Sequence, residues 1–240
     1  MIPHDLPAVL RRLRRYYETH DAPVRRFEAT RGRDPWRILV ATLLSARARD
    51  QVTAPLCQRL FERAPTPEAL KTMSLSELES FLRPLGFFRS KARHLKALPV
   101  ILEREFRGEI PRTQEGLLRL PGVGPKTANL VLAEAFSVPA ICVDVHVHRI
   151  SNRFGLVHTR TPQETEAALK TILPRARWNE WNRYLVALGQ TLCLPRRPRC
   201  ERCPVCPWCA TGSLSAPADA DRRESVRPPV RRHSAPPCGG

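Results

Sequence analysis

Apolar residues recur along this chain at intervals of three and four positions, the spacing that places them on one face of a helix. The clearest run follows Asp34-Pro35, a capping residue with a proline at the first helical position. Its apolar positions are Trp36, Leu39, Val40, Leu43 and Leu44. Further helix starts are predicted at Thr66-Pro67, at the capping box Ser74-Leu75-Ser76-Glu77 and at Thr161-Pro162, and longer helices fit residues 90–106 and 178–192. No convincing run alternates apolar and polar residues as a strand does, so the sequence predicts an all-α protein.

The sharpest break in this pattern is the stretch from Leu120 to Asn129, which predicts a tight Gly-rich hairpin running into a helix. Pro121-Gly122 interrupts the apolar approach, Gly124 gives freedom to turn, and Pro125 suits the first helical position. Backbone N–H groups at such a turn are open to a phosphate. Lys126 falls in the first helical turn, where the helix dipole disfavours a cation. The hairpin is therefore either an ordinary turn with an exposed lysine or a phosphate-binding turn with a functional one.

Charge narrows the choice of partner. The 240 residues carry 40 Lys and Arg against 23 Asp and Glu, a formal net charge of +17. Such an excess indicates a polyanion, with nucleic acid the first choice and an anionic membrane surface the second. No apolar run approaches the roughly 20 residues that span a bilayer, and no signal-peptide core is present at the N-terminus. We expect a cytoplasmic protein in which Arg11–Arg15 is a solvated helix face.

Five of the eight cysteines are crowded into one short segment. They are Cys193, Cys200, Cys203, Cys206 and Cys209. Without a secretory signal this cluster predicts a metal site in a reducing compartment rather than a disulfide framework. Two sets of four thiolates are possible, one that omits Cys193 and one that omits Cys206, and either suits zinc or a [4Fe–4S] cluster.

The loop between the first two of these cysteines carries Arg196, Arg197 and Arg199. Metal ligands at both of its ends would hold it rigid, so the loop is predicted to contact a phosphate backbone rather than to be merely solvated. Further along, residues 211–240 are rich in Pro, Ser, Ala and Arg and almost lack large apolar side chains. This tail is expected to be disordered. Its arginines either add non-specific DNA affinity or have no role.

One carboxylate follows the hairpin at the end of an apolar approach, within Val143-Asp144-Val145-His146. The segment taken by itself favours a helix N-cap role for Asp144. Together with the hairpin and the cysteines, however, it resembles a known family. The order Leu-Pro-Gly-Val-Gly-x-Lys-Thr-Ala, Val-Asp-x-His-Val-x-Arg-Ile and Cys-x6-Cys-x2-Cys-x5-Cys is similar to that of endonuclease III, a helix-hairpin-helix DNA glycosylase. The resemblance covers residues 30–210 and includes the segments Leu43–Ala46 and Gly86–Ala92.

The resemblance implies a particular organisation. It predicts a six-helix domain over residues 28–138, with the helix-hairpin-helix at about 113–136, and an iron–sulfur domain made of residues 1–27 and 139–210, followed by the disordered tail. The implied ligands of a [4Fe–4S] cluster are Cys193, Cys200, Cys203 and Cys209. Cys206 is then an extra thiol, and iron–sulfur replaces zinc as the expected cofactor.

The resemblance also implies a chemistry, that of a bifunctional DNA N-glycosylase and AP lyase acting on oxidised pyrimidines such as thymine glycol in duplex DNA. Lys126 would attack the sugar C1′ of a flipped nucleotide, form a Schiff base and allow β-elimination. Asp144 would stabilise positive charge on the sugar and assist proton transfer. Because a direct contact would blunt the amine as a nucleophile, we expect the two groups to flank a pocket. The amides of Gly122 and Gly124 would hold the DNA backbone, and His146 would lie near the flipped nucleotide.

Departures from the family pattern bear on the substrate. Arg47 replaces a glutamine that meets the opposite base, and Phe87 replaces a leucine wedge. Arginine can donate to guanine or contact phosphate. Members specialised for pyrimidine dimers, mismatched thymine or abasic sites therefore remain alternatives, as do a non-catalytic DNA-binding module and a zinc-stapled structural protein. Siblings that remove adenine lack the hairpin lysine. We expect a monomer associated with a bacterial nucleoid.

Overall fold

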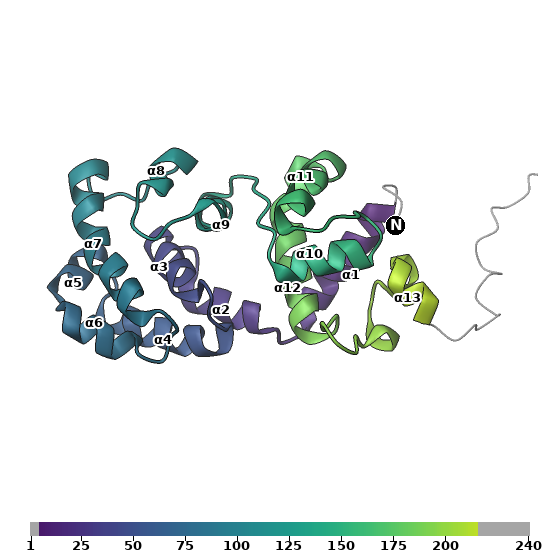
Figure 1. Ribbon diagram of the computed structural model, residues 1–240, viewed down its shortest axis with the longest axis horizontal. Helices are drawn as coiled ribbons and strands as arrows, with labels where there is room; N and C mark the ends of the chain where they lie inside the picture. The colour runs from purple at the N-terminus through teal and green to yellow at the C-terminus, as the bar shows by residue number, and fades with distance from the viewer. Residues whose placement is uncertain (1–4, 216–240) are drawn as a thin grey trace, which may run out of the picture.

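The computed structural model describes residues 5–215, and this part of the chain consists of helices and loops without a strand (Figure 1). The prediction of an all-α fold is confirmed. The α-helices are α1 (Leu6–Thr19), α2 (Pro23–Arg31), α3 (Pro35–Ser45), α4 (Asp50–Arg63), α5 (Pro67–Thr72), α6 (Leu75–Leu82), α7 (Phe88–Phe106), α8 (Gln114–Leu118), α9 (Pro125–Phe136), α10 (Val145–Arg153), α11 (Pro162–Ile172), α12 (Trp178–Thr191) and α13 (Ala210–Ser215). Short 3-10 turns cover Arg175–Arg177, Cys200–Arg202 and Cys206–Trp208.

Side-chain caps begin the helices where the sequence indicated. The Asp34 carboxylate accepts the Arg37 N–H at 2.8 Å. Ser74 and Glu77 form the reciprocal capping box, with bonds of 3.2 and 2.7 Å. Helix α7 departs from the expectation, because it begins at Phe88 rather than at residue 90. It also runs through Pro99 without ending.

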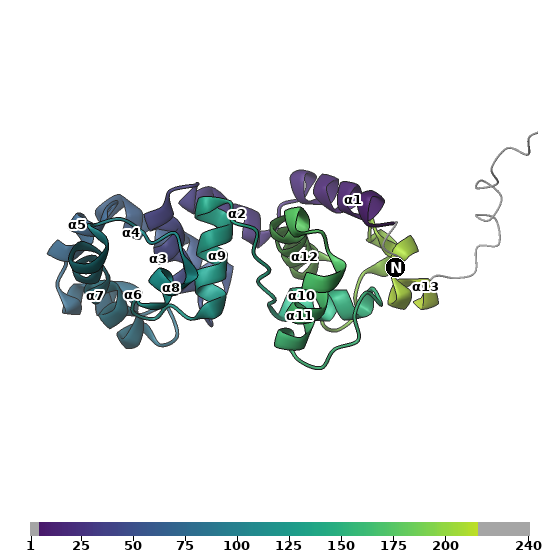
Figure 2. The same cartoon turned by 90° about the horizontal axis from the view of Figure 1, so that it is seen from above.

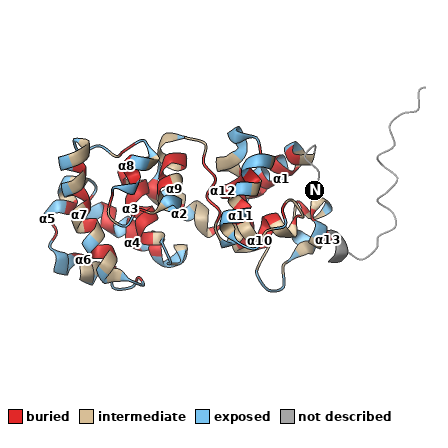
Figure 3. Cartoon of the chain, turned by 45° about the horizontal axis from the view of Figure 1, so that its top comes forward, coloured by how far each residue is buried: buried red, intermediate tan, exposed pale blue. Residues whose placement is uncertain are grey.

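The helices pack around two separate hydrophobic cores, which divide the molecule into two lobes (Figures 1 and 3). Helices α2–α9 surround the first core, and helix α1 joins α10–α13 around the second, so the first lobe is inserted into the second. The chain crosses between the lobes before α2 and after α9 (Figure 2). The fully buried side chains of the first core include Leu39, Leu44, Leu78 and Leu98. Those of the second include Leu13, Trp181 and Leu188.

A partly buried charge network joins the lobes at this double crossing. Arg183 of α12 contacts Glu28 of α2 at 3.3 Å and Glu134 of α9 at 2.9 Å. Tyr17 of α1 donates its hydroxyl to Glu28, whose pKa is raised by burial. Arg31, which is only 4% exposed, adds a contact of 3.4 Å to Glu134. Glu28 and Glu134 of the first lobe are thus both paired with Arg183 of the second.

The predicted tail is partly corrected. Helix α13 covers Ala210–Ser215, so residues 211–215 are helical. The first of these residues contact the cysteine segment, since the Gly212 N–H lies 3.4 Å from the Cys209 sulfur. The remaining predicted tail, residues 216–240, lies outside the described residues. Within residues 5–215, no helix is both long and apolar enough to cross a membrane.

Candidate active site and cysteine cavity

The Gly-rich hairpin joins α8 to α9 in the first lobe, and its left-handed residue is Gly122 rather than Gly124. Gly122 has φ +78°, and an added Cβ would lie 2.4 Å from His94 Nδ1. Gly124 has φ −100°, which other residues also adopt, and open space around it. The turn therefore requires glycine at residue 122, two residues before the predicted position. No side chain caps α9, which starts at Pro125 as predicted. Its first N–H groups therefore stay open to a ligand.

Lys126 lies exposed in the first turn of α9 and lines a large cleft between the lobes. The cleft has a volume of about 690 Å³. Leu130 and Glu134 line it from the same face of the helix, one and two turns further along. No acidic side chain among residues 5–215 pairs with Lys126. The amine is thus available to a molecule in the cleft.

Asp144 lines the same cleft from the second lobe, at the start of α10. Its Oδ1 accepts the N–H groups of His146 at 2.9 Å and of Val147 at 2.8 Å. The predicted N-cap role is confirmed, yet both capping bonds use one oxygen. Within the described residues no hydrogen bond is made to Oδ2. The Asp144 carboxylate therefore caps the helix with Oδ1 and leaves Oδ2 available to another group in the cleft.

Lys126 and Asp144 flank the cleft without an ion pair between them in the described part of the chain. The nearest link between their segments is the buried thiol of Cys142, which lies 3.9 Å from the Lys126 carbonyl oxygen. Burial raises the pKa of Cys142 to about 12, so this thiol stays neutral. Arg47 and His146 also line the cleft.

Arg47 and Phe87 come together at the end of α3 and the start of α7. The Arg47 guanidinium lies 5.6 Å from the centre of the Phe87 ring, which is 64% exposed. Both residues have a left-handed backbone, with φ of 55° and 60°. Buried Lys91, which sequence reasoning missed, donates to the Leu44 carbonyl at 2.8 Å and so ties the start of α7 to α3. Arg47 and Phe87 thus contact each other on the surface of the first lobe, and both side chains are exposed.

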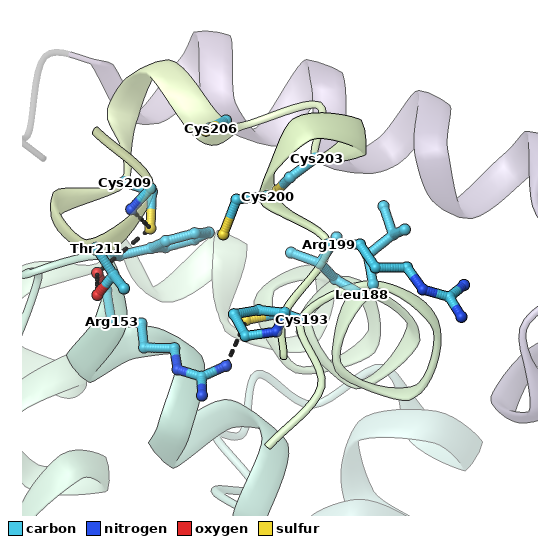
Figure 4. A pocket seen from close by; sticks show the side chains of 13 residues that line it. Arg153, Leu188, Cys193, Arg199, Cys200, Cys203, Cys206, Cys209 and Thr211 are labelled. Atoms are coloured by element: carbon cyan, nitrogen blue, oxygen red, sulfur yellow. Dashed lines mark hydrogen bonds between the residues drawn. The ribbon is translucent and has the colours of Figure 1, made fainter. Parts of the chain in front are cut away.

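The five clustered cysteines line one cavity in the second lobe (Figure 4). Its apolar walls come from Phe154, Leu188 and Leu192. Among residues 5–215 no three or more His, Cys, Asp or Glu side chains converge on one metal-ion position. The thiols surround a space instead, which is the arrangement that a multi-atom cluster requires. Cys206 packs against Gly212, where an added Cβ would lie 2.8 Å from its sulfur.

The electrostatics of this cavity fit a cationic cluster. Burial, and then the neighbouring sulfurs, raise the pKa of Cys203 to about 12, and burial also raises the pKa of Cys200 and Cys209. Four thiolates could therefore gather here only around compensating positive charge. N–H groups already point at two of the sulfurs, from Arg153 to Cys193 at 3.3 Å and from Gly212 to Cys209 at 3.4 Å.

The arginine-bearing loop is fastened to α10. Arg153 donates to the carbonyls of Leu194 at 2.7 Å and Pro195 at 2.8 Å. Arg149, one turn earlier, donates to the Cys193 carbonyl at 2.7 Å. The sequence analysis assigned neither arginine a role, although Arg149 stands in the Val-Asp-x-His-Val-x-Arg-Ile motif and His146, Arg149 and Arg153 share one helical face by their spacing. The three predicted phosphate-binding side chains project from this loop and are exposed: Arg196, Arg197 and Arg199.

The two lobes, the hairpin and the cleft between them define a class of protein. The family model of the HhH-GPD superfamily base excision DNA repair proteins matches residues 40–175. An endonuclease III of Thermotoga maritima is 44% identical over 176 residues, which are 73% of this chain and 83% of that relative. The endonuclease III-like protein 1 of Gallus gallus is 39% identical over 220 residues, covering 87% of this chain and 78% of its own length.

A solved structure of a non-covalent endonuclease III–DNA complex has the same fold, with a TM-score of 0.77 and 32% sequence identity. The match covers 90% of this chain and 98% of that one. The chain therefore belongs to the endonuclease III family. It is a base excision repair enzyme, a DNA glycosylase and AP lyase, and its partner is damaged duplex DNA.

Proposed function

We propose that this enzyme removes oxidised pyrimidines of the thymine glycol type from duplex DNA and cleaves the strand through a Schiff base on Lys126. The observation that carries the proposal is the pairing of groups across the cleft. An amine without an acidic partner lines it from the first lobe, and Asp144 lines it from the second with Oδ2 unoccupied. The cleft, at about 690 Å³, is large enough to admit a flipped nucleotide.

In the first step the Lys126 amine forms a bond to the sugar C1′ as the bond from C1′ to the base breaks. The electron pair of that bond leaves with the base, which takes a proton from water. The new ammonium loses its proton to Asp144 or to water. The bond from C1′ to O4′ breaks as O4′ takes a proton, which opens the ring and leaves a Schiff base between Lys126 and C1′. Asp144 or water then takes a proton from C2′, its electron pair forms the C2′–C3′ double bond, and the 3′ phosphate leaves.

Asp144 suits the complementary role because its two oxygens do different work. Oδ1 is held by the two amides at the start of α10, which fixes the carboxylate in place. Oδ2 can then stabilise positive charge that develops on the sugar and accept protons. No ion pair holds Lys126 in the described structure, so its side chain is free to reach a sugar in the cleft.

DNA is held, in this proposal, on both sides of the cleft. The uncapped amides around Gly122 and Gly124 bind a phosphate, and the exposed side chains of Arg196, Arg197 and Arg199 bind the backbone beside the second lobe. Arg47 and Phe87 project as one unit that would fill the space left by the flipped nucleotide. We expect a preference for guanine as the opposite base, because the Arg47 guanidinium can donate two hydrogen bonds to it.

We further propose that Cys193, Cys200, Cys203 and Cys209 hold a [4Fe–4S] cluster, with Cys206 outside the ligand set because the spacing Cys-x6-Cys-x2-Cys-x5-Cys of the endonuclease III family omits it. Bound there, the cluster would supply structural cross-linking rather than a step of the reaction. Arg149 and Arg153 would transmit that support to α10 and to the arginine loop. The two lobes correspond in this proposal to two domains. The second boundary lies near residue 138 as predicted, but the first lies at the crossing before α2, which begins at Pro23, a few residues before the predicted residue 27.

Borohydride trapping tests the proposed function. Duplexes carrying either thymine glycol or an abasic site are incubated with the iron-loaded enzyme and borohydride, and the protein–DNA adduct is measured. Adducts on both substrates are expected. An adduct on the abasic duplex alone would confine the enzyme to another lesion, and no adduct on either duplex would overturn the proposal.

A further inference from the structure

His146 is held on one side by groups that leave only one of its ring nitrogens free. Its Nδ1 lies 3.2 Å from Nη2 of Arg149, one turn along α10. The edge formed by Cβ, Cγ and Nδ1 packs on Gly189 of α12, where an added Cβ would lie 2.5 Å from Nδ1. His146 lines the cleft, and within residues 5–215 no hydrogen bond is made to its Nε2.

The contact with Arg149 determines where the ring proton lies. A guanidinium has five N–H donors and no lone pair that can accept a hydrogen bond. Nδ1 of His146 must therefore be the acceptor in this contact. A neutral imidazole carries its one proton on the other nitrogen when Nδ1 accepts, so the proton of His146 lies on Nε2.

The alternative arrangement is disfavoured by the same neighbours. A proton on Nδ1 would point an N–H at the N–H of Arg149, although it could reach toward the Gly189 carbonyl. That carbonyl already accepts Arg149 Nη2 at 3.2 Å. Burial is the largest effect on the pKa of His146 and lowers it, and Arg149 lowers it further. Asp144, the Gly189 carbonyl and Asp50 act in the opposite direction, but the net shift is downward. The ring is accordingly neutral near pH 7.

We propose that Arg149 fixes His146 as the neutral Nε2–H form, so that His146 presents a permanent hydrogen-bond donor to an oxygen of the flipped nucleotide beside Asp144. This inference rests on the proposed function only for the identity of the nucleotide. A donor at this position serves one of two oxygens. It stabilises the carbonyl oxygen of the departing base, where negative charge grows, or it holds a backbone oxygen of the same nucleotide.

Arg149 is a positioning residue in this scheme, and Arg153 provides its matched control. Both arginines lie on one face of α10, and both bond to the segment that begins at Cys193. Only Arg149 contacts the ring of His146. Replacing Arg149 with Met should therefore change the state of His146, whereas Arg153→Met should leave it unchanged.

Nitrogen NMR of the iron-loaded enzyme, labelled on histidine, tests the assignment without DNA. The two-bond couplings between ring protons and nitrogens identify the protonated nitrogen directly. The expected result at about pH 7 is a neutral His146 with its proton on Nε2, mixed forms or a raised pKa in Arg149→Met, and the wild-type pattern in Arg153→Met. A proton on Nδ1, or a charged ring, in the wild-type enzyme would overturn the proposal.

Three measurements on DNA then locate the acceptor, using His146→Leu, which removes the donor, and His146→Gln, which restores one. They are base release from thymine glycol duplex, β-elimination on an abasic duplex, and affinity for a duplex with a tetrahydrofuran abasic analogue. His146→Leu should lose on the order of 10-fold or more, with partial recovery in His146→Gln. Loss confined to base release assigns the acceptor to the base, and parallel loss in all three assigns it to the backbone. No loss in any measurement would overturn the donor role.

A wild-type enzyme that releases no oxidised pyrimidine would defeat the proposed function alone. The NMR result and the abasic measurements would still decide the state and role of His146.

Discussion

Two helix N-termini face each other across the cleft, and they are finished in opposite ways. Helix α10 is capped by its own Asp144, which satisfies two of its first amides with one oxygen. Helix α9 has no side-chain cap and places Lys126 in its first turn, where a cation is unfavourable. The first arrangement stabilises the chain and fixes a carboxylate. The second gives up local stability to leave open amides and a free amine, as a binding and reacting site requires.

The largest effect is expected at the start of α9, the helix without a side-chain cap. Replacing Lys126 with Gln removes the nucleophile and an unfavourable charge from the start of α9. Covalent trapping and strand cleavage should fall by roughly 10³-fold or more, while the melting temperature stays the same or rises slightly. Circular dichroism and affinity for intact duplex serve as controls. Cleavage by Lys126→Gln at a rate near that of the wild type would contradict the assignment of the nucleophile.

At the capped end, two substitutions separate stability from chemistry. Asp144→Asn keeps an oxygen for the amides of His146 and Val147 but removes the charge at Oδ2. Its single-turnover rate should fall by about 10²-fold with little change in unfolding free energy. Asp144→Ala should lose a similar rate and, in addition, about 1 kcal/mol of stability in urea unfolding. Equal stability of the two variants would show that the cap contributes nothing.

The hairpin before α9 allows a smaller and sharper test. Gly122→Ala should cost about 1–2 kcal/mol, because φ is +78° and the new Cβ would meet His94. Gly124→Ala should change the unfolding free energy by less than about 0.5 kcal/mol, since its surroundings are open, yet weaken DNA binding by obstructing the amides. Urea unfolding and fluorescence anisotropy measure the two quantities. The reverse pattern would exclude this hairpin as a phosphate site.

The smallest effect is expected at Cys142, which connects the two ends. Its buried thiol lies near the Lys126 carbonyl, so Cys142→Ala should lower stability by about 1 kcal/mol and leave the reaction rate within a few-fold of wild type. With a pKa of about 12, the thiol should also resist alkylation in the folded enzyme at moderately alkaline pH. Mass spectrometry of alkylated peptides checks this, and fast labelling of Cys142 would contradict its burial.

Much of this fold is encoded locally. Asp34, Ser74 and Thr161 were recognisable as helix starts because each capping side chain accepts a hydrogen bond from the N–H three residues later. Such a contact depends only on the local sequence. The all-α class and the family followed from such signals and from motif order. Local signals also failed in two places. They assigned the sharp turn of the hairpin to Gly124 rather than Gly122, and they predicted a disordered tail from residue 211, where the structure has helix α13 up to Ser215.

The site was less accessible from the sequence. Lys126, Asp144 and the cysteines stand in motifs, and the structure brings the first two to one cleft and the cysteines to one cavity. Their chemical roles stay predictions. Lys91, Arg149 and Arg153 were missed because each acts on a carbonyl or sulfur that is distant in sequence. Such partners are set by how α7 meets α3 and how α10 meets α12, which no local pattern records.

The paired charges at the double crossing have a mechanical consequence. Pulling the lobes apart there would separate Arg183 from Glu28 and Glu134 and leave Arg31 as their basic neighbour in the first lobe, so these contacts oppose separation of the lobes. The two lobes should thus keep a fixed relative position when DNA binds, and the duplex should bend to fit the cleft. Helical DNA that is already weakened or kinked by a lesion bends most cheaply. The stiffness of the protein would then help to sort damaged sites from intact ones before any base is read.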